Sequence, residues 1–463
     1  MRTFTLKGLF LTAVFMLLGS LTIQAADDDL ITKQITIKLD EAGTLPDRIA
    51  SSRKYKITNL KIVGEINGTD LQKICDMAGY DYHSGSTKGN LSVLDLSEAK
   101  IVSGGEAYYG YFDTNKRENI FYYTYEDKIG DYAFYGCAKL TSLTLPSNLT
   151  KIGKNAFEGC RGLTSLNLPA GITTIDYYTF LGCTGLTSVT LPESITEIGY
   201  GAFRGCTGLT SLNLPASITT INGYAFYGCT GLTNLTLPAS LTWIGHSAFE
   251  GCRGLTSLTL PAGITSIGES AFENCTELTS VTLPSSLYRI YYDAFHGCSA
   301  LKEVRFCIND DLETYLTKGH PYINVDCDIK YYLNDKEITS IVIPSNVNSL
   351  GDYAFQKCST LQSVYVSWPT PISAGKAFNE VDVSKCTLYV PQGTEQDYWL
   401  AEVWCDFGNI VEFDATGIDK TTTSTDIEEV VRYSVNGQRL VGPTKGLNIV
   451  KYSDGSVKKV AVQ

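Results

Sequence analysis

The chain has 463 residues, of which 43% are hydrophobic and 19% are charged, so it can bury a core and is not a disordered chain. Its formal net charge of −12 at pH 7 comes from 49 acidic and 37 basic residues, and no basic stripe is visible. Phosphate binding depends on clustered Lys and Arg. The charge therefore argues against nucleic acid as a partner, and equally against an anionic membrane surface.

The first residues have the pattern of a secretory signal peptide. Arg2 and Lys7 give a basic start, residues 8–23 form an apolar run, and Ala25 offers a small residue for cleavage. We expect residues 1–25 to be removed on export and no later segment to span a membrane. The alternative is that the apolar run remains as a short membrane anchor.

Residues 27–126 precede the regular part of the chain. They contain strand-like runs at residues 35–39 and 60–64, and residues 91–97 are a degenerate version of a strand that recurs later. Terminal units of a repeat stack leave one face of their core open and need atypical caps. We therefore expect residues 27–126 to be an N-terminal cap with irregular rungs.

A strict 23-residue repeat fills the middle of the chain. Each copy reads Ile-Gly-x-x-Ala-Phe-x-Gly-Cys-x-x-Leu-Thr-Ser-Leu-x-Leu-Pro, with one cysteine at a fixed place. A fixed period of this size predicts a solenoid, in which one unit is stacked on copies of itself. The cysteines that mark the period are Cys137, Cys160, Cys183, Cys206, Cys229, Cys252, Cys275 and Cys298.

Within each copy, the alternation in Leu-Thr-Ser-Leu-x-Leu predicts a half-buried strand, and the following Pro ends it because Pro has no N–H to donate. We expect Ala-Phe-x-Gly-Cys to form a single helical turn that buries Phe. The cysteine row predicts buried free thiols, because Cys is often buried and the side chains of a parallel ladder do not point at each other. A straight row without nearby His does not suit zinc.

The period breaks after residue 287 and resumes near Phe355. We expect the solenoid to span residues 127–366, with an irregular insert around residues 307–335. Cys307 and Cys327 flank this insert, which makes them candidates for a disulfide.

Three segments follow. The aromatic block at residues 367–415 suits a C-terminal cap, and the Thr-rich segment 416–427 reads as a linker. Residues 428–463 carry hairpin signals and are expected to form a small β module for sorting or docking. Cys386 and Cys405 are a second candidate disulfide pair.

The repeat resembles the BspA-like (type 5) leucine-rich-repeat family of surface proteins of anaerobic bacteria and some protists. The resemblance rests on the Ile-Gly-x-x-Ala-Phe-x-Gly-Cys-x-x-Leu core and extends to flanking segments at residues 66–70, 94–97, 389–391 and 404–407. It implies a mainly β, α-poor fold: a right-handed leucine-rich-repeat stack of 23-residue rungs with irregular caps. It also implies a secreted or cell-surface protein that adheres to host matrix proteins or coaggregation partners. The end of the chain resembles C-terminal modules of exported proteins in such bacteria.

Catalysis is not expected. The chain has four His, and no Gly-x-Ser-x-Gly, His-Glu-x-x-His or Gly-rich phosphate loop accompanies them. The resemblance carries over no catalytic residue. We therefore expect no enzymatic activity, no cofactor and no metal.

Two surfaces are candidates for binding. One is the outward face of the repeated strand, which is an uncharged lattice of Ser, Thr and Asn. The alternative to a binding role is that these hydroxyl ladders only stabilise the sheet. The other is a track beside each Phe, where the residue types vary while the core stays fixed, and where Tyr and Arg are typical of binding hot spots. We call this second set the tyrosine track; it comprises Tyr132, Tyr135, Tyr177, Tyr178, Tyr200, Arg204, Tyr224, Tyr227 and Tyr292.

These features predict an exported, monomeric surface protein that engages host or bacterial surface proteins through an extended repeat surface. Many weak contacts in a row would add up to useful affinity. The alternatives are a glycan-binding scaffold and a structural surface spacer without a ligand.

Overall fold

The computed structural model describes residues 29–284, 286–287, 289–307, 330–333, 336–343 and 345–413, together with five short strands after residue 421. The predicted signal peptide and the predicted Cys307–Cys327 pair lie outside the part described in atomic detail. Within that part, no helix is both long enough and apolar enough to cross a membrane.

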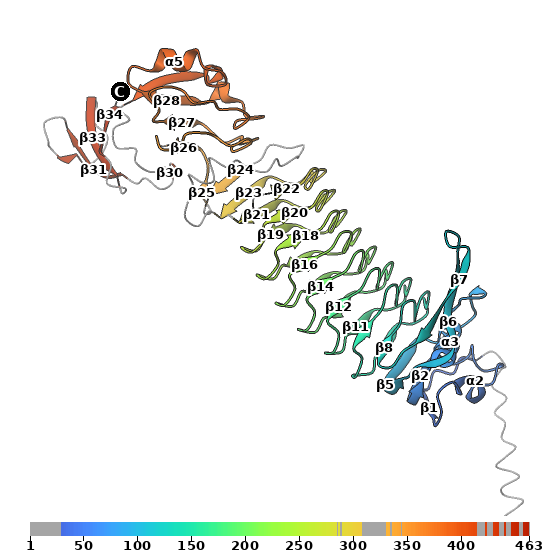
Figure 1. The fold of residues 1–463 in the computed structure, drawn as a ribbon. Coiled ribbons are helices and arrows are strands. Elements are labelled where there is room, and N and C mark those ends of the chain that lie inside the picture. Colours follow the sequence, from blue (N-terminus) through green and yellow to red (C-terminus); the bar gives the residue numbers. More distant parts are fainter. Residues whose placement is uncertain are drawn as a thin grey trace, which may run out of the picture.

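The molecule is an elongated stack of β rungs with little helix (Figure 1). Strands from successive copies of the repeat pair in parallel, residue by residue, at the 23-residue period: Ser165 lies opposite Ser188, and Leu166 opposite Val189. This confirms the predicted mainly β solenoid. The longer strands of successive rungs are β9 (Ser142–Thr144), β11 (Ser165–Asn167), β13 (Ser188–Thr190), β15 (Ser211–Asn213), β17 (Asn234–Thr236), β19 (Ser257–Thr259) and β21 (Ser280–Pro284).

A second, shorter strand in each rung forms another parallel ladder. Its Ile side chain points into the core, as for Ile175 opposite Ile198, both fully buried. The strands are β8 (Lys128–Ile129), β10 (Lys151–Ile152), β12 (Thr174–Ile175), β14 (Glu197–Ile198), β16 (Thr220–Ile221), β18 (Trp243–Ile244), β20 (Ser266–Ile267) and β22 (Arg289–Ile290).

The N-terminal region continues the first ladder with longer strands, since Leu94 lies opposite Leu143 in the same parallel sheet. A helix packs beside these strands, and an antiparallel hairpin, β6–β7, projects from the stack (Figure 1). The elements are β1 (Ile35–Leu39), α2 (Leu45–Arg48), β2 (Asn59–Ile66), α3 (Gly68–Met77), β3 (Tyr80–Asp81), β4 (Gly85–Ser86), β5 (Val93–Ile101), β6 (Gly104–Asp113) and β7 (Glu118–Thr124).

The C-terminal region continues the stack beyond the insert. Phe378 stacks on Phe355 at 5.1 Å, so a rung persists beyond residue 366, and Trp404 is buried against Phe378 and Phe407. The last four strands form a separate antiparallel sheet. The elements are β23 (Glu303–Cys307), β24 (Lys330–Leu333), β25 (Lys336–Glu337), β26 (Ser340–Ile343), β27 (Ser363–Val366), η1 (Val383–Lys385), β28 (Thr387–Pro391), α5 (Glu395–Trp399), η2 (Trp404–Asp406), β29 (Asn409–Phe413), β30 (Thr422–Thr423), β31 (Glu429–Ser434), β32 (Arg439–Leu440), β33 (Gly446–Tyr452) and β34 (Val457–Val462).

A column of phenylalanine rings runs through the array. Neighbouring rings lie 5.0 to 5.5 Å apart and within 11° of parallel, from Phe134 to Phe295. All of them are buried. Each ring therefore contacts the rings above and below, which couples every rung to its neighbours.

The cysteine row forms a ladder of hydrogen bonds between rungs. Each thiol from Cys160 to Cys298 donates to the carbonyl oxygen of the Phe one rung earlier, at Sγ–O distances of 3.0 to 3.4 Å. These cysteines are buried and free, which confirms the predicted thiol row. Within the described part of the chain, no group of His, Cys, Asp or Glu is placed to hold a metal.

The predicted pairing of Cys386 with Cys405 is wrong. Both thiols are free; Cys386 is buried and donates to the Leu361 carbonyl at 3.0 Å, whereas Cys405 is exposed. Cys386 thus also donates to a carbonyl oxygen of the preceding rung, although the acceptor belongs to a Leu and not to the Phe that the regular array uses.

The helical turn predicted for Ala-Phe-x-Gly-Cys is also wrong. Successive i to i+3 turns form there, but the residue two places before Phe and the Gly two places after it adopt positive φ, as at Tyr132 and Gly136. This geometry aims the N–H groups of Tyr132, Phe134 and Gly136 at carbonyl oxygens of the next rung, at 2.7 to 2.9 Å. A helical turn would direct these groups along its own axis and leave the rungs unconnected at this edge.

Candidate functional site

Three of the nine residues of the tyrosine track lie at one unusual backbone position. The residue two places before each Phe of the regular array has a φ between 50° and 61°. We call it the left-handed slot; its occupants are Tyr132, Asn155, Tyr178, Gly201, Tyr224, Ser247, Ser270 and Asp293.

The left-handed region suits Gly, Asn and Asp, and a bulky L-residue there costs roughly 1–2 kcal/mol. The slot is imposed by the stack, because its N–H donates to the next rung: Tyr178 to the Tyr200 carbonyl at 3.0 Å, and Tyr224 to the His246 carbonyl at 2.9 Å. Three of the eight slots nevertheless hold Tyr. Backbone requirements alone do not explain that choice, which points to a use for the side chains.

Aromatic rings from four successive rungs meet at the centre of the array. The Tyr178 and Tyr200 rings are 5.5 Å apart and nearly perpendicular, Tyr200 and Tyr224 are 5.3 Å apart, and Tyr224 and His246 are 4.8 Å apart. Gly201 makes room for this arrangement, since a Cβ there would lie 2.4 Å from the Tyr178 ring. We call this group, with Tyr177, Arg204 and Tyr227, the central cluster.

Arg204 gives the central cluster its positive charge. Its guanidinium lies over the Tyr227 ring at 4.8 Å and over the Tyr224 ring at 5.5 Å, within the range of cation–π attraction. Desolvation raises the pKa of the Tyr200 phenol, so this group is a protonated hydrogen-bond donor at neutral pH. Tyr177 and His246 are exposed and the other members are half-buried. The surface therefore offers ring faces, phenol hydroxyls and one cation to a partner.

Tyr132 and Tyr135 lie in a different environment from the central cluster. Tyr132 stacks on Tyr109 at 4.4 Å and 4°, and Tyr135 lies 5.1 Å from both Tyr80 and Tyr109. These rings are half-buried between the N-terminal region and the first rung. They join the projecting hairpin to the array, which is a structural role.

Tyr292 stands apart from both groups. It is 68% exposed, and within the described residues its ring contacts no other aromatic ring. The structure thus divides the tyrosine track into the central cluster, a packed N-terminal pair and one isolated ring.

The strand face has the predicted orientation. In β9 to β19, the first and third residues are exposed and the middle one faces the core, as for Ser188 and Thr190 around Val189. The Thr just before each of several strands donates its hydroxyl to the carbonyl of the equivalent Thr one rung earlier, as from Thr164 to Thr141 at 3.1 Å. These bonds stabilise the stack, whereas the exposed hydroxyls remain available.

Reasoning from the sequence missed a further set of aromatic residues, on strand β7 of the hairpin and directly after it. Phe121, Tyr123 and Tyr125 are 47%, 44% and 59% exposed. They lie outside the 23-residue period, so the comparison between copies that identified the tyrosine track does not reach them. The dense run of Tyr and Phe between residues 108 and 125 was the available signal.

A family model described as BspA type Leucine rich repeat region matches the chain in six copies, over residues 108–230, 196–320 and 329–395. Among proteins with curated descriptions, none matches.

Solved structures of several bacterial repeat proteins are similar to this chain. A Treponema pallidum leucine rich repeat protein is 31% identical over 31% of this chain and 73% of its own length, with a TM-score of 0.28. A leucine-rich repeat protein from Bacteroides ovatus is 23% identical over 63% of this chain and 89% of its own, with a TM-score of 0.34. A leucine rich cell surface protein from Faecalibacterium prausnitzii is 25% identical over 62% of this chain and 76% of its own, with a TM-score of 0.31.

The family model spans the regular array, its N-terminal hairpin and the first rungs after the insert, which together exceed half of the chain. The chain belongs to the BspA-type leucine-rich-repeat family.

Proposed function

We propose that this protein is an exported cell-surface protein that binds macromolecules, such as host matrix proteins or the surface proteins of other bacteria, through the central cluster. The observation that carries the proposal is the meeting of Tyr178, Tyr200 and Tyr224 on successive rungs, two of them in left-handed slots. Half-buried Tyr rings with an Arg guanidinium packed beside them are typical of interface hot spots.

Family membership supports the same proposal. Leucine-rich-repeat solenoids bind through extended surfaces, and one similar solved protein is described as a cell surface protein. Each rung of the central cluster offers a small contact, and their fixed spacing lets a partner engage several at once.

The proposal is tested by surface plasmon resonance of the purified protein on a panel of extracellular-matrix proteins and on whole bacterial cells. A triple variant, Tyr177→Ser, Tyr200→Ser and Tyr224→Ser, removes exposed ring surface without touching the Phe column. We expect its affinity for the bound partner to fall at least about tenfold, or about 1.4 kcal/mol.

The matched control is a strand-face variant with Ser188→Ala, Ser211→Ala and Asn234→Ala. Unchanged binding by this control supports the central cluster. If only the control loses affinity, the strand face is the binding surface instead. If the unaltered protein binds no partner, the spacer interpretation replaces the proposal.

A further inference from the structure

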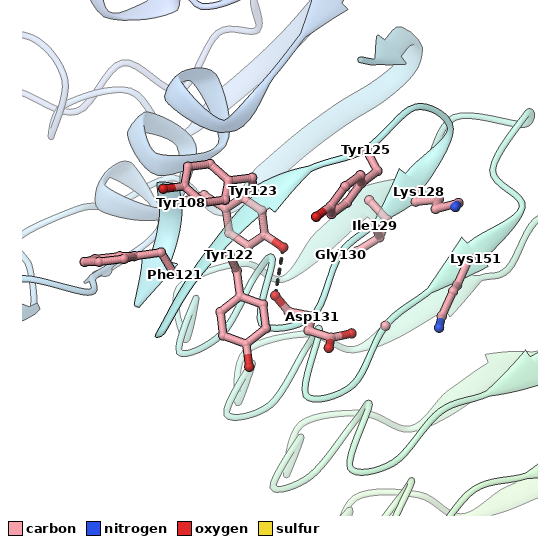
Figure 2. Close-up of a pocket in the computed structure, with 11 residues that line it drawn as sticks. Tyr108, Phe121, Tyr122, Tyr123, Tyr125, Lys128, Ile129, Gly130, Asp131 and Lys151 are labelled. Carbon is pink, nitrogen blue, oxygen red and sulfur yellow. Dashed lines mark hydrogen bonds between the residues drawn. The ribbon is translucent and has the colours of Figure 1, made fainter. Parts of the chain in front are cut away.

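A pocket of about 430 Å³ lies between the hairpin β6–β7 and the first two rungs (Figure 2). This volume is within the range of about 300–1,000 Å³ that is usual for small-ligand sites. Figure 2 shows Phe121 at one end, Lys128 and Lys151 at the other, and Tyr123, Tyr125 and Asp131 between them. We call it the hairpin pocket.

The two faces of the hairpin differ in how their rings are covered. On one face, Tyr109 and Tyr122 pack with Tyr132 in the cluster that joins the hairpin to the array. On the other, Phe121 lies over Gly110, where a Cβ would come within 2.7 Å of the ring. Among the described residues, no aromatic ring stacks on Phe121, Tyr123 or Tyr125. These ring faces are open to a ligand.

Polar groups line the pocket beside these rings, and the scaffold holds them in place. The Asp131 carboxylate uses Oδ1 to accept the Lys154 N–H at 2.9 Å, and the buried Tyr108 hydroxyl donates to the Asp131 carbonyl at 2.8 Å. Asp131 lines the pocket, and no described side chain donates to its Oδ2 atom, which leaves that oxygen as a free acceptor. A fixed acceptor of this kind lowers the entropy cost of binding.

The cations of the hairpin pocket differ in how they are paired. Lys151 forms an ion pair with Asp176 at 3.4 Å, whereas Lys128 has no ion-pair partner within the described part of the chain. The two lysines lie opposite each other on adjacent strands, β8 and β10. Lys128 is therefore the available donor at this end of the pocket.

We infer that the hairpin pocket binds a sugar unit of a glycan. A pyranose ring has an apolar face of C–H bonds and a rim of hydroxyls. The exposed aromatic rings of the pocket can stack on the apolar face. The free Asp131 carboxylate oxygen, the free Lys128 ammonium and the phenol hydroxyls can bond to the sugar hydroxyls. An apolar peptide anchor needs a dry, fully enclosed pocket. Rings that are 44% to 59% exposed cannot provide one, but they suit a ligand that stays partly hydrated.

The inference rests on residues outside the central cluster, so either proposal can fail alone. The test is a glycan array with host and microbial oligosaccharides, probed with the purified protein, followed by calorimetric titration of each oligosaccharide that binds. Tyr125→Ala removes a ring wall, and Asp131→Asn keeps the bond to the Lys154 N–H while removing the negative charge. We expect each change to weaken binding at least about tenfold.

Phe112→Ala is the matched control, because Phe112 is 56% exposed on the same hairpin and does not line the pocket. Unchanged glycan binding by Phe112→Ala, with loss in the other two variants, supports the site. The inference is overturned if no oligosaccharide binds, or if Phe112→Ala weakens binding as much as Tyr125→Ala. Thermal unfolding of all three variants shows whether a loss reflects misfolding.

Discussion

A left-handed backbone conformation at one position of every rung costs different residue types different amounts of conformational free energy. Asn155 and Gly201 adopt this conformation easily, whereas Tyr178 and Tyr224 do so at a cost. The cost of the Tyr residues is offset in part by ring contacts and by the Arg204 cation. Strain and surface contacts thus act in opposite directions at the slot, so the stability of the fold depends only weakly on which side chain occupies it.

Tyr224→Asn should therefore change the free energy of unfolding by less than about 1 kcal/mol, since relief of the left-handed strain compensates for lost ring contacts. Phe226→Ala, two residues along the same turn, should cost about 3–5 kcal/mol because it removes a fully buried ring. Urea titrations followed by circular dichroism compare the two. Equal losses would show that Tyr224 belongs to the core and not to a binding surface.

The thiol row also has consequences for single residues. Burial raises the pKa of Cys183 and Cys229 to about 12, because no water solvates their thiolates. The folded state therefore binds the thiol protons more tightly than the unfolded state does. The stabilisation is complete below pH 9, and it is lost as the pH rises towards 12.

We expect the free energy of unfolding to fall by about 1.4 kcal/mol per pH unit for each such thiol between pH 9 and 12. Urea titrations at pH 8 and pH 10 measure the fall, and a Cys183→Ala variant should show a shallower dependence. In native protein at pH 8, iodoacetamide should label Cys405 and spare the buried thiols. Rapid labelling of Cys183 would contradict the buried ladder.

At the scale of elements, α3 shows how the N-terminal region is anchored. Asn67 and Asp70 form a capping box, and the fully buried Asp70 carboxylate also accepts the N–H groups of Gly43 and Leu45 at 2.6 and 2.9 Å. One carboxylate thereby fixes both the start of α3 and the loop that enters α2.

Asp70→Ala should lower the free energy of unfolding by about 2–4 kcal/mol, since it leaves several buried N–H groups without an acceptor. Asp81→Ala is the control: the Asp81 carboxylate also accepts backbone N–H groups, from His83 and Ser84, but in an exposed turn. The control should cost less than about 1 kcal/mol. Similar losses in thermal unfolding for the two variants would contradict the anchoring role of Asp70.

Elements differed in how far the sequence predicted them. The strand of each rung was predictable because Leu166 and its equivalents alternate with polar residues. The turn around Phe134 was not, because its N–H groups bond to a rung 23 residues further along and not to their own segment. The hairpin β6–β7 was also missed: both of its faces carry aromatic residues, so no alternation is visible between Tyr108 and Tyr125.

The candidate site was predictable only in outline. Variation among copies identified Tyr178, Tyr200 and Tyr224 as surface residues. It could not show that the rings of these three residues meet, nor that Tyr132 packs against Tyr109. Both contacts depend on which residues the adjacent rung or the N-terminal hairpin places beside each ring.

For the whole molecule, coupling between identical rungs dominates. In the regular array the Phe column and the thiol ladder run from rung to rung, and parallel strand pairing joins most neighbouring rungs, so each rung is stabilised chiefly by its neighbours. Stability should then depend on the number of rungs and on keeping the chain in phase.

Deleting residues 230–252, one full 23-residue period, should leave a folded protein with a lower free energy of unfolding and a smaller urea m-value, because less surface is buried. Deleting residues 230–241 puts the following strand and turn out of phase and should abolish cooperative unfolding. Circular dichroism and size-exclusion chromatography distinguish the outcomes. If the two deletions behave alike, the 23-residue rung is not the repeating unit of the stack.

The left-handed slot has a consequence for how such a protein changes over time. Bonds to the neighbouring rung set its backbone, so Tyr, Asn, Gly, Ser and Asp all occupy the same geometry within one chain. A point mutation at a slot therefore alters the outer surface while the interior stays as it was. New binding preferences become accessible one codon at a time, and the architecture tolerates each intermediate along the route.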